Sequence, residues 1–186
     1  RGFGDVYKRQ VGVVLENDEV IKAKKIVLAP GRDGSAWLTK VLKQHGLELY
    51  NNQVDIGVRV ETSNIVMEEI NNNLYEGKFI YNTTVGTRVR TFCSNPSGHV
   101  VIENHSGTML ANGHAYHDPK LGSKNTNFAL LVSHTFSEPF NQPNEFAHEV
   151  SRLANKLSNG SVIVQRYGDI KRGRRTTYKR LKEGYT

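Results

Sequence analysis

The chain contains very little cysteine and no long run of apolar residues. Its single cysteine, Cys93, excludes a disulfide within the chain and disfavours a structural zinc site, which needs several thiolate or imidazole ligands. No apolar stretch approaches the roughly 20 residues that a membrane-spanning helix needs. These two features predict a protein with no membrane partner, and they make the cytoplasm the expected compartment.

The first ten residues, RGFGDVYKRQ, contain no methionine. Residues 5–10 can be back-translated into a string that looks like the transposase mosaic end used to build sequencing libraries. We therefore interpret residues 1–10 as a sequencing-adapter artefact and exclude them from the predicted elements. On this interpretation, the natural N-terminus lies further upstream.

The composition is typical of a folded protein, with 37% hydrophobic and 23% charged residues among 186. The net charge of +7 is unevenly distributed along the chain. Residues 1–10 contribute +2 and residues 166–186 contribute +6, whereas residues 11–165 hold 14 basic and 15 acidic side chains. The basic surface typical of a DNA-binding domain is not indicated, so the charge pattern disfavours a nucleic-acid partner.

The segment from residue 11 to residue 50 predicts a small strand-and-helix unit. Residues 11–16 and 19–22 are rich in β-branched side chains and flank an Asn-Asp turn, which predicts a hairpin. Residues 26–29 form a short apolar run that predicts a buried strand. Apolar spacing predicts a helix over Ser35–Gln44, with Gly46 at its C-terminal end.

The segment from residue 51 to residue 165 predicts an antiparallel sheet with helices, and we place the boundary between the two parts near residues 47–53. Strict alternation in VDIGVRVE, residues 54–61, predicts a half-buried strand. Helices are expected over Asn64–Asn73 and over 145–157, the second ending at Asn159-Gly160. Turns such as SNPSG and ANGH separate the further predicted strands, which are residues 78–82, 87–93, 99–103 and 127–134.

Between the predicted buried strand and the first helix, the sequence reads KKIVLAPGRDGSAWL. Glycines in this turn allow a phosphate to approach the backbone, and a helix N-terminus presents free N–H groups. The part IVLAPGRDGSAWL resembles the second flavin fingerprint of the two-dinucleotide-binding-domain flavoproteins. Further along, VDIGVRVE, RTFC-x-N-P-x-G-x-VV-x-E and NTNFALLV resemble the uncharacterised bacterial FAD-dependent dehydrogenases with their C-terminal substrate-type domain. The resemblance extends over nearly all of residues 11–177.

This resemblance implies an α/β fold, of α+β type in this fragment. Residues 11–50 would be the β-meander and strand-helix piece of an FAD-binding Rossmann-like domain, residues 51–165 an antiparallel-sheet substrate-type domain with helices, and residues 166–186 a basic truncated segment. The function implied is that of an oxidoreductase, a dehydrogenase with FAD as cofactor in the full-length protein and a small-molecule substrate. The chain lacks the GxGxxG turn that binds the ADP half of FAD in such proteins. We therefore expect the central fragment of a longer flavoenzyme, with an incomplete FAD site.

The resemblance also suggests which residues bind cofactor and substrate. The predicted FAD contacts are Ala29, Pro30, Gly31, Arg32 and Gly34. Arginine offers a bidentate fork to anionic groups, so basic strand residues are candidates for cofactor or substrate anions. The substrate-binding candidates are Arg59, Arg88, Arg90 and Asn127. For Arg59 a cross-strand salt bridge on an exposed face is an equal alternative, and for Asn127 an ordinary turn residue is another.

The sequence predicts neither a catalytic thiol nor a metal site. Basic neighbours could lower the pKa of Cys93, but a lone strand cysteine is more often a small buried residue, and we predict no catalytic role for it. His114 and His117 are three residues apart in a segment that we interpret as a loop. They have no clear third ligand, so no metal site is predicted.

The basic C-terminal stretch GDIKRGRRTT supports an alternative function. It could contact nucleic acid or an acidic partner, which would make the chain a non-catalytic binding module. A solvated connecting segment is the favoured interpretation. The rest of the chain is neutral, and no aromatic residue is interleaved with the basic run. Binding that survives high salt would count against the nucleic-acid alternative.

Overall fold

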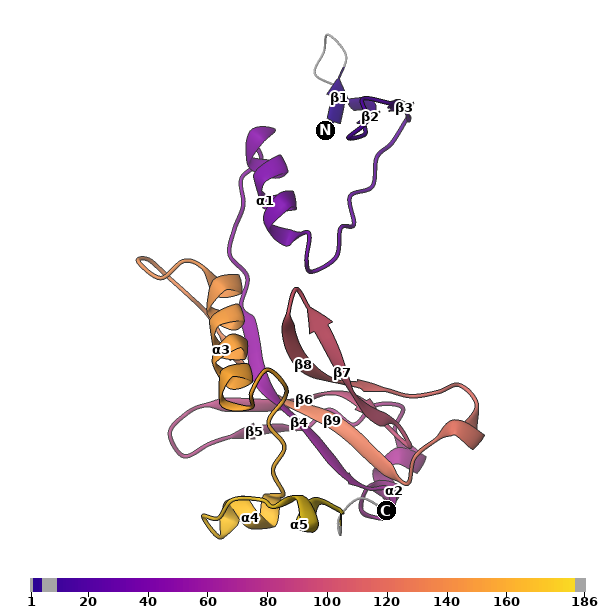
Figure 1. The fold of residues 1–186 in the computed structure, drawn as a ribbon, viewed down its shortest axis with the longest axis vertical. Coiled ribbons are helices and arrows are strands. Elements are labelled where there is room, and N and C mark those ends of the chain that lie inside the picture. Colours follow the sequence, from indigo (N-terminus) through magenta and orange to yellow (C-terminus); the bar gives the residue numbers. More distant parts are fainter. Residues whose placement is uncertain (1, 5–9, 183–186) are drawn as a thin grey trace. The chain divides into compact units, whose positions relative to one another are not determined.

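The computed structural model describes residues 2–4 and 10–182, which belong to two units, residues 1–49 and 50–186 (Figure 1). Every strand pairing among the described residues is antiparallel. The predicted mixed α/β class with an antiparallel sheet is therefore confirmed, whereas the described strands include no parallel pair of the kind that a Rossmann sheet contains. The adapter interpretation concerns residues 1–10, of which residues 1 and 5–9 lie outside the described part.

The first unit contains a three-stranded sheet in the order β1-β2-β3 and one helix. The predicted hairpin is confirmed, since Val14 on one strand lies opposite Val20 on the next. Its turn is closed by Asn17, whose Oδ1 accepts a hydrogen bond of 3.1 Å from the backbone N–H of Glu19. The elements are β1 (Gly2–Gly4), β2 (Gln10–Val14), β3 (Val20–Lys22) and α1 (Ser35–Gln44).

Helix α1 has the bounds predicted for it and ends as predicted at Gly46, which has a φ of +71°. The N–H of Gly46 donates to the carbonyl of Lys43 at 3.0 Å, and the N–H of Leu47 donates to that of Leu42 at 3.1 Å, which is the Schellman arrangement. The predicted buried strand over residues 26–29 is wrong. That segment is not a strand, and Val27 is 89% exposed, because no described strand lies beside it to bond its backbone groups.

The second unit contains a four-stranded antiparallel sheet in the order β4-β9-β6-β5. Strand β9 lies at its centre and pairs with β4 over ten residues, from Val54 opposite His134 to Ser63 opposite Asn125. These pairings confirm the strands predicted near residues 54–61, 78–82, 87–93 and 127–134. The strands are β4 (Val54–Ser63), β5 (Ile80–Asn82), β6 (Arg88–Asn95) and β9 (Asn125–His134).

A separate two-stranded sheet is formed by β7 (His99–His105) and β8 (Thr108–His114). The strand predicted at residues 99–103 is confirmed, but the prediction of a turn at ANGH is wrong, because residues 111–114 belong to β8. The turn lies instead at Ser106 and Gly107, whose φ angles are +50° and +87°. Positive φ at both positions suits a tight hairpin, and the glycine supplies the second one without steric cost.

The helices of the second unit include the two that were predicted, α2 (Asn64–Asn73) and α3 (Pro143–Leu157). Helix α2 follows β4 directly, and Ser63 Oγ accepts from the backbone N–H of Ile65 at 3.3 Å as its N-cap. Helix α3 packs against β8 and β4. Three short helices were not predicted: η1 (Pro119–Leu121), α4 (Tyr167–Lys171) and α5 (Tyr178–Lys182). Within the described ranges, no helix has both the length and the apolar character needed to cross a membrane.

The most deeply buried side chains of the described residues are polar. Thr126 and Asn127, adjacent on β9, are fully buried, and Asn155 of α3 is 9% exposed. The Oδ1 of Asn155 accepts from the backbone N–H of Met109 at 2.7 Å, and its Nδ2 donates to the Met109 carbonyl at 2.9 Å and to the Ser161 carbonyl at 3.0 Å. One amide side chain therefore holds α3, β8 and the segment after α3 together.

Replacing Asn155 with alanine should lower the free energy of unfolding by about 1–3 kcal/mol, because backbone groups of Met109 and Ser161 would lose buried partners. The matched control is Asn73→Ala in α2. The Nδ2 of Asn73 donates to the Glu69 carbonyl at an exposed position, so its loss should change the stability by less than about 0.5 kcal/mol. Urea denaturation measures both values, and equal effects would contradict the bridging role of Asn155.

Candidate functional site

Two of the predicted substrate-binding residues lie together on one face of the sheet. In the pairing of β4 with β9, Arg59 lies opposite Ala129, and Asn127 is two residues further along β9 on the same face. The Nε of Arg59 donates a hydrogen bond of 2.9 Å to Oδ1 of Asn127. The alternative interpretation of Arg59, a cross-strand salt bridge, is wrong, because the partner of the guanidinium is an amide oxygen.

This pair holds two buried hydrogen-bond donors that have no acceptor among the described residues: Nη2 of Arg59 and Nδ2 of Asn127. The amide orientation follows from its neighbours, since Oδ1 of Asn127 accepts from Arg59 and also, at 3.4 Å, from Nδ2 of Asn95. Burial lowers the pKa of Arg59, and the nearby Cys93 opposes this shift. A buried cationic donor without an acceptor is costly, so the arrangement is suited to an acceptor that comes from a ligand.

A glycine of the β7–β8 hairpin lies directly over this pair. A Cβ atom built on Gly113 of β8 would lie 1.5 Å from Nη2 of Arg59 and 2.2 Å from Oδ1 of Asn127. Only the lack of a side chain lets β8 approach so closely. Gly113 was not predicted as a site residue, although a glycine inside a strand is a known signal for the close approach of another group.

Strand β6 contributes to the same face through an irregularity. The register between β6 and β9 shifts between Phe92 and Asn95, which places Asn95 opposite Asn127. Cys93 lies inside this bulge with a φ of +49°, and its backbone N–H donates to Oε1 of Glu76 at 2.9 Å. The expectation that Cys93 is a small buried residue is wrong: it is exposed, because the bulge removes it from the regular ladder.

The other two candidate arginines do not join the pair. Nη2 of Arg90 lies 2.5 Å from Oδ2 of Asp55, whose Oδ1 accepts from Oγ of Ser133 at 2.6 Å. The Arg90 guanidinium also lies 5.2 Å from the ring centroid of Phe92. The charge of Arg90 is thus compensated within the protein, and Arg88 is exposed at the first residue of β6.

In the first unit, the predicted FAD-binding residues form a turn at the start of α1. Ala29, Pro30, Gly31 and Arg32 are exposed. Gly31 has a φ of +72°, and a Cβ on Gly34 would lie 2.4 Å from Cβ of Pro30, so the backbone requires glycine at both positions. Gly34 is also the N-cap of α1, with no side-chain cap and no acidic residue in the first turn.

His99 and His114 form aromatic contacts, and the described residues contain no metal cluster. His114 belongs to β8, so its assignment to a loop is wrong, and its ring packs edge-on against Tyr116 at 5.2 Å between centroids. His99 contacts the same tyrosine at 5.7 Å. Throughout residues 2–4 and 10–182, no group of three or more His, Cys, Asp or Glu side chains could hold a metal ion.

The basic C-terminal segment is folded around one carboxylate. It therefore differs from the solvated connecting segment that was predicted. Asp169 of α4 is 2% exposed. Its Oδ1 accepts from Nε of Arg174 at 2.6 Å, and its Oδ2 accepts from Nε of Arg180 at 3.0 Å and from Oγ1 of Thr176 at 2.9 Å. Burial disfavours the charged carboxylate, but these three hydrogen bonds outweigh it and hold the pKa of Asp169 well below its usual range.

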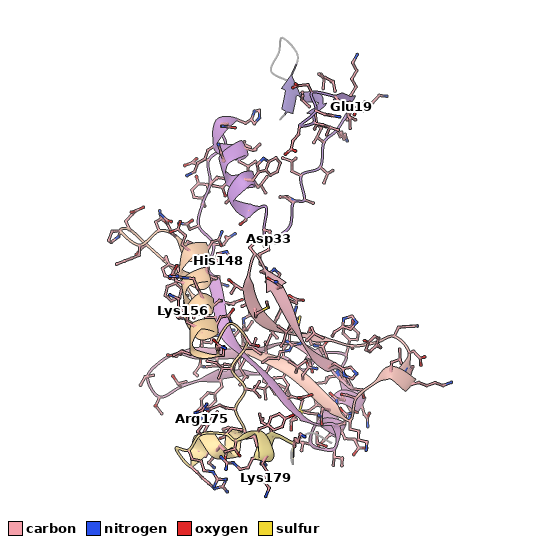
Figure 2. The ribbon with its side chains drawn as sticks, in the orientation of Figure 1. Glu19, Asp33, His148, Lys156, Arg175 and Lys179 are labelled. Carbon is pink, nitrogen blue, oxygen red and sulfur yellow. The ribbon has the colours of Figure 1, made fainter. Side chains whose placement is uncertain are left out.

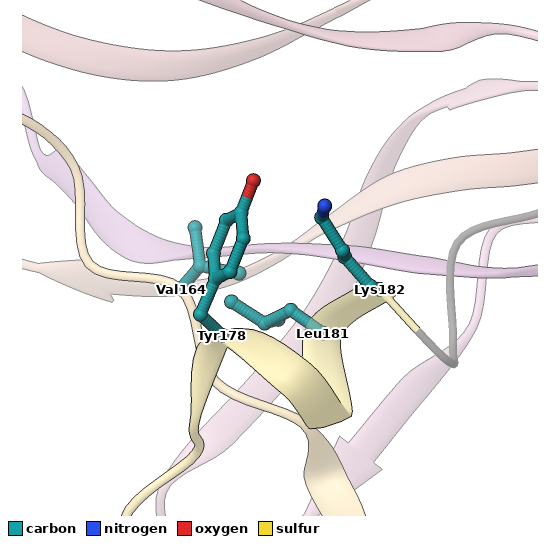
Figure 3. A pocket seen from close by; sticks show the side chains of 4 residues that line it. All are labelled: Val164, Tyr178, Leu181 and Lys182. Atoms are coloured by element: carbon teal, nitrogen blue, oxygen red, sulfur yellow. The ribbon is translucent and has the colours of Figure 1, made fainter.

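Two exposed tyrosines flank the basic run GDIKRGRRTT, one on each side. Tyr167 and Tyr178 are 74% and 73% exposed. The Nζ atoms of Lys171 and Lys182 lie 5.9 Å and 5.0 Å from their respective ring centroids. Tyr178 and Lys182 also line a shallow hollow with Val164 and Leu181 (Figure 3). The exposed side chains of Arg175 and Lys179 project outward from the same segment (Figure 2).

Comparison with known proteins identifies no relative of the chain. No protein-family model matches the chain, and no curated protein matches it significantly. The resemblance of the sequence to FAD-dependent dehydrogenases therefore stays a prediction.

Replacing Gly113 with alanine should lower the free energy of unfolding by about 2–3 kcal/mol, because the new methyl group would overlap the Arg59 guanidinium and force β8 away from it. Gly122→Ala is the matched control in the same unit. There the new Cβ would lie 3.1 Å from its nearest neighbours, the Pro119 carbonyl oxygen and Ser97 Cβ. We expect a loss below about 1 kcal/mol for it in urea denaturation. A Gly113→Ala protein as stable as the control would contradict the close approach of β8.

Replacing Asp169 with asparagine should release Arg174 and Arg180, which limited trypsin digestion followed by mass spectrometry would detect as faster cleavage after both residues. The lowered pKa of Asp169 also sets a pH dependence. The stabilisation by its carboxylate is fully present above the ordinary carboxyl pKa of about 4 and is lost as the pH falls below it. The control for the digestion is Glu149→Gln, which removes an exposed ion pair with Arg152 and should leave the cleavage after Arg174 and Arg180 unchanged. Unchanged cleavage in Asp169→Asn would show that the carboxylate does not order the segment.

Proposed function

We propose that the chain is the central part of a cytoplasmic FAD-dependent oxidoreductase, in which Arg59 and Asn127 orient an anionic small-molecule substrate. The observation that carries this proposal is the pair of buried donors, Nη2 of Arg59 and Nδ2 of Asn127, without an acceptor. Substrate sites are characterised by a few well-placed polar groups that determine the orientation of the ligand. The antiparallel sheet of the second unit supplies such groups from β4 and β9, which agrees with a substrate-type domain.

The first unit supports the cofactor part of the proposal through the turn before α1. Gly31 has open space at its Cβ position, whereas Gly34 lies against Pro30, and the start of α1, which has no side-chain cap, offers N–H groups to a phosphate. These residues fit the phosphate part of a dinucleotide, and on this proposal residues 11–50 are part of a Rossmann-like FAD-binding domain. FAD, when bound, would supply hydride transfer at the flavin ring.

The alternative of a non-catalytic binding module has one observation in its favour. The exposed Tyr167 and Tyr178 lie beside lysines, as in surfaces where bases stack and phosphates pair with cations. Against it, Arg174 and Arg180 are already bound to Asp169 and are therefore less available to a partner. These two ion pairs therefore favour the oxidoreductase over the binding module.

The flavin proposal is tested in the product of the parent gene, with the variants Gly31→Ala and Gly46→Ala. Both glycines have φ near +70° with open space at the Cβ position, so both substitutions introduce the same backbone strain of about 1–2 kcal/mol. Only Gly31→Ala alters the proposed phosphate-binding turn, and it should weaken FAD binding about tenfold in a fluorescence titration. A parent protein that binds no flavin would overturn the proposal. Equal FAD affinities of the Gly31→Ala and Gly46→Ala variants would show that the turn before α1 does not bind the cofactor.

A further inference from the structure

We infer that Arg59 and Asn127 form a binding site for a small carboxylate, so that the substrate carries this group. The use of the site in catalysis rests on the proposed oxidoreductase function, whereas the binding itself does not. Three properties of the site lead to this class of ligand: the polarity of its free atoms, its net charge, and the structure that covers it.

The free atoms of the site can only donate hydrogen bonds. The guanidinium of Arg59 has no acceptor atom, and the only acceptor of the Asn127 side chain is already used by Arg59 and Asn95. A matching ligand must therefore present acceptors. A carboxylate presents two oxygens in one plane, which can accept from two neighbouring N–H donors at once.

The charge of the site is that of one arginine without a compensating carboxylate. Among the described residues, Arg59 forms no ion pair, whereas Arg90 on the neighbouring strand is neutralised by Asp55. A buried charge is tolerated when a partner of opposite sign approaches it. One uncompensated positive charge is matched by a monoanion such as a carboxylate, whereas a phosphate dianion would leave excess negative charge.

The cover of the site can move without loss of sheet hydrogen bonds. Both free donors are buried, and Gly113 of β8 lies next to Nη2 of Arg59, so a ligand reaches this donor when the hairpin shifts. Strands β7 and β8 form a sheet of their own, with no ladder to the four-stranded sheet. A shift of the end of β8 that carries Gly113 leaves the ladders of β4, β9 and β6 intact, while Asn155 holds the other end of β8 through the backbone of Met109.

The experiment measures binding of acetate to the whole chain by isothermal titration calorimetry and by the thermal unfolding midpoint. Sodium chloride and sodium phosphate at equal ionic strength serve as comparison anions. Acetate should raise the midpoint of the wild type more than either of them. Arg59→Gln should weaken acetate binding about tenfold or more, because a charge-assisted hydrogen bond is lost. The control Arg175→Gln removes the same charge from an exposed position of the C-terminal segment and should bind acetate like the wild type.

The variant Arg59→Lys keeps the inference testable if the glutamine variant does not fold, because lysine retains the charge but loses the planar pair of donors. It should also bind acetate more weakly than the wild type. Acetate binding that is absent in the wild type, equal in Arg59→Lys and wild type, or no stronger than that of phosphate would overturn the inference. Flavin binding to the parent gene product is measured separately, so the loss of either proposal leaves the other standing.

Discussion

The antiparallel pairing of β4 with β9 over ten residues on each strand determines where the other parts of the second unit lie. It places Arg59 diagonally across from Asn127 on one face. On the opposite face, Thr126 donates from Oγ1 to Oδ1 of Asn64 at 2.7 Å and accepts from Nδ2 of Asn71 at 2.8 Å, which ties α2 to the sheet. A shift of one residue in this register would exchange the two faces. The candidate site and the attachment of α2 therefore depend on the same strand pair.

Polar side chains, more than apolar ones, occupy the best-buried positions of the described residues. Val58 of β4 is 63% exposed although it lies on the apolar side of its strand, whereas Thr126 and Asn127 are fully buried. The hydrophobic effect is non-directional, but a buried hydroxyl or amide is stable only with particular partners at particular distances. The positions of α2, α3 and the β7–β8 hairpin are consequently specified by directional contacts, which explains why single substitutions at such residues should have distinct local effects.

The elements with strong local signals could be predicted from the sequence, and those that depend on contacts could not. The alternation of residues 54–61 and the apolar spacing of Ser35–Gln44 identified β4 and α1. The apolar run at residues 26–29 misled the prediction, because a strand also needs a neighbour. Arg59 and Asn127 could be selected one by one for their chemistry. Their contact is separated by 68 positions in the chain, and the role of Gly113 depends on a third strand, so neither was visible in local patterns.

Asp169 and Arg59 show how the hydrogen-bond partners of a charged group separate a structural role from a binding role. The carboxylate of Asp169 receives three hydrogen bonds from Arg174, Thr176 and Arg180, so its charge is balanced inside the protein and its contribution is to local order. Arg59 gives one hydrogen bond to a neutral amide and keeps a second nitrogen buried without an acceptor. A carboxylate with its hydrogen-bond partners in place gains little from a ligand, since any new partner must replace an existing one. A donor pair without acceptors gains from every suitable acceptor, and this difference is the reason to look for a ligand at Arg59 and not in the more basic C-terminal segment.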